Sequence, residues 1–120
     1  MTSAVPALPP EVAGVLDDYA ADRRPDRLQE KAAVKATLAV LVERAPGRSV
    51  EVRIPPYAAV QAIEGTTHRR GTPSAVVETD ARTWLLLSCG QLAWADAVAA
   101  GAVRASGARS DLGAWLPLFT

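Results

Sequence analysis

The chain has 120 residues, which fits one domain, and 49% of them are hydrophobic, which excludes a disordered tail. Thirteen basic residues cancel thirteen acidic ones, so we expect neither a nucleic-acid surface nor tight docking on anionic membranes. The single cysteine excludes an internal disulfide, and the lack of a visible signal peptide or of an apolar run of ~18 residues predicts a cytoplasmic protein without integral membrane association.

The N-terminal region has the features of a tail followed by a helix. Residues 1–8 are mostly small and interrupted by proline, so we predict a flexible tail ahead of a single domain over 9–120. Pro10 can open a helix, because proline in the first turn lacks only an N–H that would have no partner there. Apolar residues then recur at the spacing of one helical face up to Tyr19, and this helix is expected to end before Pro25.

A long second helix and a strand region follow. Asp26 is a predicted N-cap for a helix over 27–44, which is rich in strong helix formers. Apolar and charged residues alternate over 50–54, which is typical of a half-buried strand. Residues 57–63 fit either a second strand or a short helix, because their alanines leave the two structures equally open.

Glycines mark the ends of the later elements. Residues 75–78 form a further predicted strand, after which Asp80 can cap a helix that stops at Gly90. The next, shorter helix stops at Gly101, and residues 103–106 alternate as the last strand. Strands in one block with helices on either side predict an α+β fold, in which helices cover a small mixed or antiparallel-rich sheet of about four to five strands.

The C-terminus is strongly apolar. We expect a closing helical turn through Leu112, Trp115 and Leu116 that ends at Pro117. An exposed apolar patch of this size is unfavourable, so the C-terminus is expected to cover a core, plug a pocket or join a partner.

Few residues have the chemistry of a catalytic or metal site. His68 is the only histidine and lies in a polar loop beside Arg69 and Arg70, which is either an ordinary exposed loop or an anion-binding loop. Cys89 follows a helix, whose negative carboxyl end disfavours a thiolate, so an inert thiol is expected. One histidine and one cysteine cannot supply a transition-metal site, so we predict no catalytic residue, no metal and no cofactor.

The tryptophans Trp84, Trp94 and Trp115 all lie in the last third of the chain. On helical faces such residues either fill a core or line an apolar pocket with a polar mouth, and the sequence leaves both interpretations open. The order of elements here resembles the C-terminal half of the sterol carrier protein type 2 family. The features that carry the resemblance are the strand from Ala75, the helix that Asp80 leads with Trp84 and Leu85, the Gly90 and Gly101 stops, the strand to Gly107 and the apolar end.

The helix over 27–44 and the strand over 50–54 fit the first half of the same family, so the resemblance covers about residues 27–118. It is closest to the small stand-alone members found in actinobacteria. The resemblance implies a sheet with helices packed over it and an apolar cavity between them for fatty acyl chains, acyl-CoA or sterol-like lipids. It implies no catalytic residue.

We therefore expect non-catalytic binding and carriage of an apolar small molecule or lipid. The residues expected to line the cavity are Trp84, Leu85, Leu87, Trp94, Val98, Leu112, Trp115 and Leu116. The loop residues expected at the cavity mouth are His68, Arg69 and Arg70.

Two other hypotheses remain. In the first, the same fold is a protein-interaction or dimerisation module without a ligand, and an apolar C-terminal face forms a homodimer. In the second, the protein is an accessory to thiol-dependent metabolism, because a related domain is fused to mycothiol-dependent isomerases. This second hypothesis would require a role for Cys89 or His68.

Overall fold

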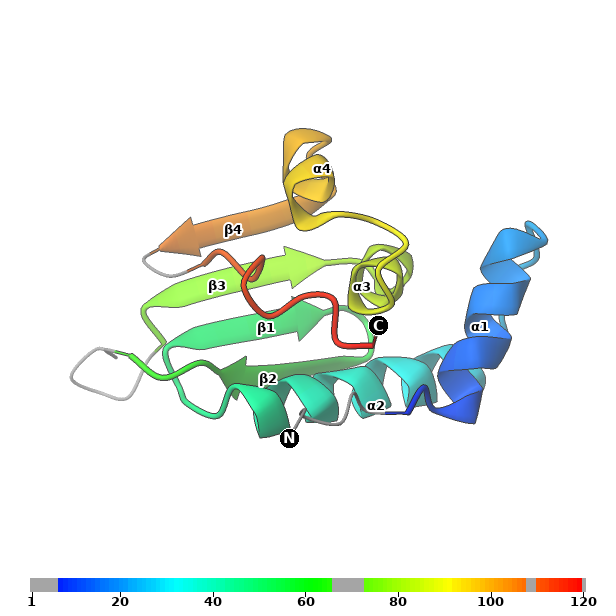
Figure 1. Ribbon diagram of the computed structural model, residues 1–120, viewed down its shortest axis with the longest axis horizontal. Helices are drawn as coiled ribbons and strands as arrows, with labels where there is room; N and C mark the ends of the chain where they lie inside the picture. Colours follow the sequence, from blue (N-terminus) through cyan, green and yellow to red (C-terminus); the bar gives the residue numbers. More distant parts are fainter. Residues whose placement is uncertain (1–6, 66–72, 108–109, 120) are drawn as a thin grey trace, which may run out of the picture.

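A computed structural model of the chain describes residues 7–65, 73–107 and 110–119, and Figure 1 shows how its elements are arranged. Within these ranges, four helices accompany a four-stranded sheet with the strand order β2-β1-β3-β4. The elements are α1 (Pro10–Ala20), α2 (Arg27–Arg44), β1 (Val50–Ile54), β2 (Ala58–Ala62), β3 (Ala75–Thr79), α3 (Ala81–Ser88), α4 (Trp94–Ala99) and β4 (Val103–Gly107). The predicted α+β class with a mixed sheet is confirmed.

The sheet is mixed because each of its two central strands, β1 and β3, has one parallel and one antiparallel neighbour. β1 pairs antiparallel with β2 and parallel with β3, and β3 pairs antiparallel with β4. The pairing of Val50 with Ala62 and of Ile54 with Ala58 resolves the open alternative at 57–63 in favour of a strand. On β1, Val50, Val52 and Ile54 are buried, whereas Arg53 is exposed, so one face of the sheet holds the core.

Side-chain caps define the start of two helices. α2 has the predicted bounds, and one carboxylate oxygen of Asp26 accepts hydrogen bonds from the N–H groups of Leu28 and Gln29 at 3.1 and 3.2 Å. Asp80 caps α3 in the same way and accepts from the N–H of Thr83 at 2.8 Å. Each cap satisfies N–H groups that have no partner inside the helix.

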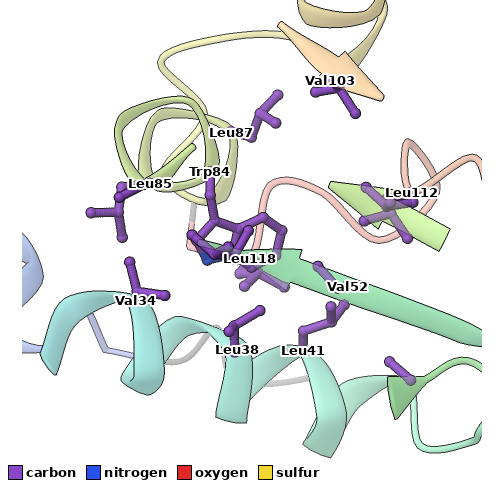
Figure 2. Close-up of a cluster of buried hydrophobic side chains, with 14 of the residues drawn as sticks. Val34, Leu38, Leu41, Val52, Trp84, Leu85, Leu87, Val103, Leu112 and Leu118 are labelled. Carbon is purple, nitrogen blue, oxygen red and sulfur yellow. The ribbon is translucent and has the colours of Figure 1, made fainter. Parts of the chain in front are cut away.

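The core lies between the buried face of the sheet and helices α2 and α3 (Figure 2). Trp84 Nε1 donates a hydrogen bond of 2.7 Å to Thr37 Oγ1, so the one polar atom of this buried ring has a partner. The fully buried side chains around the Trp84 ring are Leu38 and Leu41 from α2, Val52 from β1, and Leu118.

The predicted closing helical turn through Leu112, Trp115 and Leu116 is present as a turn at residues 113–115, and it does not continue as a helix. The N–H groups of Trp115 and Leu116 donate to Leu112 O at 2.9 and 3.2 Å, and the helical path stops there. Pro117 has no N–H to continue it, and its ring disfavours a helical conformation at the preceding residue.

We call residues 110–119 the C-terminal segment. It runs across the sheet toward α3 in Figure 1, and the N–H groups of Leu118 and Phe119 both donate to Ser88 O at 2.8 and 3.2 Å. Arg44 also donates from its guanidinium to Leu118 O at 3.3 Å. Leu112, Leu118 and Phe119 are buried, so the C-terminal segment covers the core.

Candidate functional site

Four of the residues predicted to line a cavity belong to the packed core. Trp84, Leu85, Leu87 and Leu112 are each at most 1% exposed. Packing of this kind stabilises the fold whether or not a ligand binds. A role for these side chains in lining a ligand cavity therefore stays a prediction.

Three of the predicted residues meet at a hollow of about 290 Å³ between the end of α3, the start of α4 and the C-terminal segment. No charged side chain is among its lining residues. We call it the apolar hollow, and it is lined by Leu87, Gly90, Leu92, Ala93, Trp94, Gly113, Leu116 and Pro117.

Gly113 lets the C-terminal segment approach the indole ring that forms one wall of the apolar hollow. A Cβ at this position would lie 3.2 Å from Trp94 Cδ1 and 2.9 Å from Asp111 Oδ1. The N–H of Gly113 donates to the same Asp111 oxygen at 2.7 Å, which fixes the turn. A side chain at this position would therefore require the Asp111 carboxylate and the Trp94 ring to shift.

The other predicted site residues lie elsewhere. Val98 is 43% exposed on the surface of α4, because this six-residue helix buries only Ala97. Trp115 is half-buried and packs against the core. His68, Arg69 and Arg70 lie outside the residues that the structure describes.

Cys89 is half-buried at the end of α3, and burial raises the pKa of its thiol. The group is therefore held in its protonated and less nucleophilic form near neutral pH. In the ranges that the structure describes, no three acidic, histidine or cysteine side chains lie close enough together to hold a metal ion. No helix of those ranges is long and apolar enough to cross a membrane.

A second concave site was missed by the sequence analysis. It is a groove of about 640 Å³ beside α1, the start of α2, the turn after β1 and the start of α3. We call it the arginine groove, and it is lined by Tyr19, Asp22, Arg23, Arg24, Pro25, Arg27, Glu30, Pro56, Tyr57 and Arg82.

The lining of the arginine groove includes a hydrogen-bonded carboxylate. Glu30 accepts from the hydroxyl of Tyr19 at 2.5 Å and from that of Tyr57 at 2.7 Å, through a different oxygen in each case. Burial, and then the hydrogen bond to Glu30, raises the pKa of both phenols, so both stay protonated near neutral pH. The Arg82 guanidinium lies 5.1 Å from the centre of the Tyr19 ring, a cation–π distance.

The sequence features that form this groove also fit ordinary local structure, so they do not indicate a site by themselves. Tyr19 fits the apolar stripe of α1, and the residues up to Pro25 were interpreted only as a helix end. Arg82 and Tyr57 come from distant parts of the chain. Only the concentration of arginines between α1 and α2 could have pointed to a charged site.

The fold and the apolar hollow define a small α+β domain in which two helices and a C-terminal segment cover one face of a mixed sheet. The family model described as the bacterial SCP ortholog matches residues 26–118, which is more than half of the chain. The chain therefore belongs to the bacterial sterol carrier protein family, and the predicted resemblance is confirmed. No match was found among curated proteins.

Proposed function

We propose that this protein binds and carries an apolar ligand, a fatty acyl chain or a sterol-like lipid, without catalysing a reaction. Membership of the sterol carrier family supports a lipid-like ligand. The observation that carries the proposal is the apolar hollow, whose walls include Leu87, Trp94 and Leu116. Its volume of about 290 Å³ is close to the lower end of the ~300–1,000 Å³ range of small-molecule sites, so it fits part of such a ligand.

The rest of the ligand needs space that the C-terminal segment fills. Leu112 and Leu118 occupy the region between the sheet and the helices (Figure 2), and Phe119 is buried in the same core cluster. A ligand that entered from the apolar hollow would replace these apolar side chains with its own apolar surface, so that little hydrophobic burial would be lost. In this proposal, Trp84 and Leu85 meet the ligand only when the C-terminal segment moves away.

A carrier role without catalysis also agrees with the chemistry of Cys89. Burial raises the pKa of its thiol, and the cause of the shift is burial rather than a neighbouring base. An activated cysteine nucleophile needs the opposite environment, with a lowered pKa. The structure therefore gives no support to the thiol-metabolism hypothesis at this residue.

Native mass spectrometry of the purified protein, combined with lipid extraction, tests the proposal. We expect a co-purifying mass that corresponds to an acyl chain or a sterol-like lipid. A mass of the chain alone, above all as a dimer, together with no response to any added fatty acid, would contradict the proposal and favour the interaction module.

A matched pair of variants locates the binding site. Leu92→Ser introduces a hydroxyl into the apolar hollow, and we expect it to weaken fatty-acid binding about tenfold, which corresponds to the burial of one leucine side chain. Val98→Ser makes a similar apolar-to-hydroxyl change at a position outside the apolar hollow and should leave the affinity unchanged. Equal effects of the two variants would place the ligand elsewhere.

A further inference from the structure

The arginine groove concentrates positive charge in a chain whose net charge is zero. Arg23, Arg24 and Arg27 come from the connection between α1 and α2 and from the start of α2, and Arg82 comes from α3. Figure 1 shows why they converge: β1 and β3 both end on the side of the molecule where α1 meets α2. The turn after β1 and the start of α3 are thereby brought to the same place.

Three of the four arginines make no direct ion pair in the ranges that the structure describes. Arg23 pairs with Asp18 at 3.1 Å. Arg24, Arg27 and Arg82 make no ion pair with any carboxylate in the part of the chain that the structure describes. Guanidinium groups with free N–H donors are suited to bind the oxygens of an anion, often two at a time.

The acidic residues of the groove do not cancel this charge. Four arginines line it against two carboxylates, Asp22 and Glu30. Both oxygens of Glu30 already accept a tyrosine hydroxyl. Because Asp18 pairs with Arg23, three unpaired arginines face the two lining carboxylates, so the groove keeps an excess of one positive charge, which attracts the negative charge of a phosphate monoester.

The groove also has room for the group that carries such a phosphate. Past Tyr57 it continues into a second hollow of about 380 Å³, which shares Arg27, Pro56 and Tyr57 with the groove and adds Leu28 and Lys31. Leu28 is a large apolar side chain there that the described part of the chain leaves 76% exposed. Tyrosine rings and this leucine offer apolar surface next to the cations.

We propose that the arginine groove binds the phosphate group of a small phosphomonoester, with Arg24, Arg27 and Arg82 on the phosphate and the Tyr57 side holding the organic group. This binding does not depend on lipid carriage in the apolar hollow. The phosphate could belong to a free metabolite or to a lipid headgroup with a terminal phosphate. The chemistry of recognition is the same for both sources.

Isothermal titration calorimetry with phenyl phosphate, at constant ionic strength, tests the proposal on the full chain. We expect saturable binding by the wild type and about a hundredfold loss in the double variant Arg24→Gln/Arg82→Gln, because each charge-assisted contact contributes about tenfold. Arg104→Gln is the matched control, because the Arg104 side chain is 85% exposed and pairs with Glu78, away from the groove. The phenyl phosphate affinity of this variant should be unchanged. Urea unfolding of each variant checks that it is folded.

A vesicle arm distinguishes the two sources of the phosphate. The second assay is co-sedimentation with phosphatidylcholine vesicles that contain phosphatidic acid. If the wild type and Arg104→Gln bind these vesicles, the double variant does not, and free phenyl phosphate does not bind, the ligand is a lipid headgroup. Binding of phenyl phosphate in solution assigns a free metabolite. If neither probe binds, or if Arg104→Gln weakens binding as much as the double variant, the proposal is overturned. Each of these outcomes is independent of fatty-acid binding, which is measured separately.

Discussion

The two concave sites lie at opposite ends of α3 and are built in opposite ways. The apolar hollow begins at Leu87 near the carboxyl end of the helix and draws on two stretches of the last third of the chain. The arginine groove begins at Arg82 near the amino end and combines parts of the first two helices with the turn after β1. Apolar sites made by neighbouring segments follow from hydrophobic patterning, whereas a charged site made by distant segments depends on the topology.

Trp84 lies on α3 between the two sites, and its truncation should have the largest effect. Trp84→Ala should lower the free energy of unfolding by about 3–5 kcal/mol, because it removes a buried aromatic ring and leaves a cavity. It also removes the hydrogen bond to Thr37. Urea unfolding measures the effect. Trp94→Ala, at the half-buried wall of the apolar hollow, should cost clearly less, and equal losses would mean that the two indoles are equally packed.

A crossed pair of titrations tests whether the two sites act independently. If the sites are independent, Arg24→Gln/Arg82→Gln should lose about a hundredfold in phenyl phosphate affinity and keep its fatty-acid affinity. Leu92→Ser should do the reverse, with about a tenfold loss for the fatty acid only. Both affinities are measured by calorimetry on the same preparations. A variant that lowers both would indicate that α3 couples the two sites.

The variant Tyr57→Phe tests whether both oxygens of the Glu30 carboxylate must accept a hydrogen bond for phosphate to bind well. Tyr57→Phe removes one of the two hydrogen bonds to this carboxylate and should lower the free energy of unfolding by about 1 kcal/mol. It also frees a carboxylate oxygen that repels phosphate, so phenyl phosphate should bind more weakly. Adding Glu30→Gln to Tyr57→Phe should restore the affinity, and a failure to do so would contradict the role given to the carboxylate.

The smallest expected effect is a change in alkaline stability. Burial, and then the hydrogen bond to Glu30, raises the pKa of Tyr19 above its ordinary value of 10.0. The unfolded chain therefore loses this proton before the folded protein does, so the contribution to stability is complete below about pH 10 and is lost as the pH rises further. Urea midpoints at about pH 8 and about pH 11 should differ less in Tyr19→Phe than in the wild type. An unchanged difference would exclude Tyr19 as the cause.

Much of the fold could be predicted because local signals agreed with the final packing. The cap at Asp26 and the helical periodicity placed α2 at its observed bounds. Residues 57–63 could not be assigned, because only the pairing with β1 decides between strand and helix. The closing turn stays short for a related reason: Gly113 and Pro117 weaken a helix, and the bonds to Ser88 direct the chain elsewhere.

The candidate sites were predicted less completely. Leu87, Trp94 and Leu116 lie around one hollow, and apolar spacing on consecutive elements indicates such a shared face. Their role in lining a ligand cavity stays a prediction. Val98 follows the same spacing but is 43% exposed, since α4 is too short to bury a second position. The arginine groove could not be predicted, because nothing in a single sequence tells which face of α3 meets the connection between α1 and α2.

The shared acceptor at the end of α3 provides an internal reporter of motion. The amide groups of Leu118 and Phe119 both donate to the carbonyl oxygen of Ser88. Their protons can exchange with solvent deuterium only when the C-terminal segment leaves this oxygen. Hydrogen exchange at these two positions therefore measures how often the space between sheet and helices opens in the absence of any ligand, and a bound lipid that replaces the segment should speed the exchange.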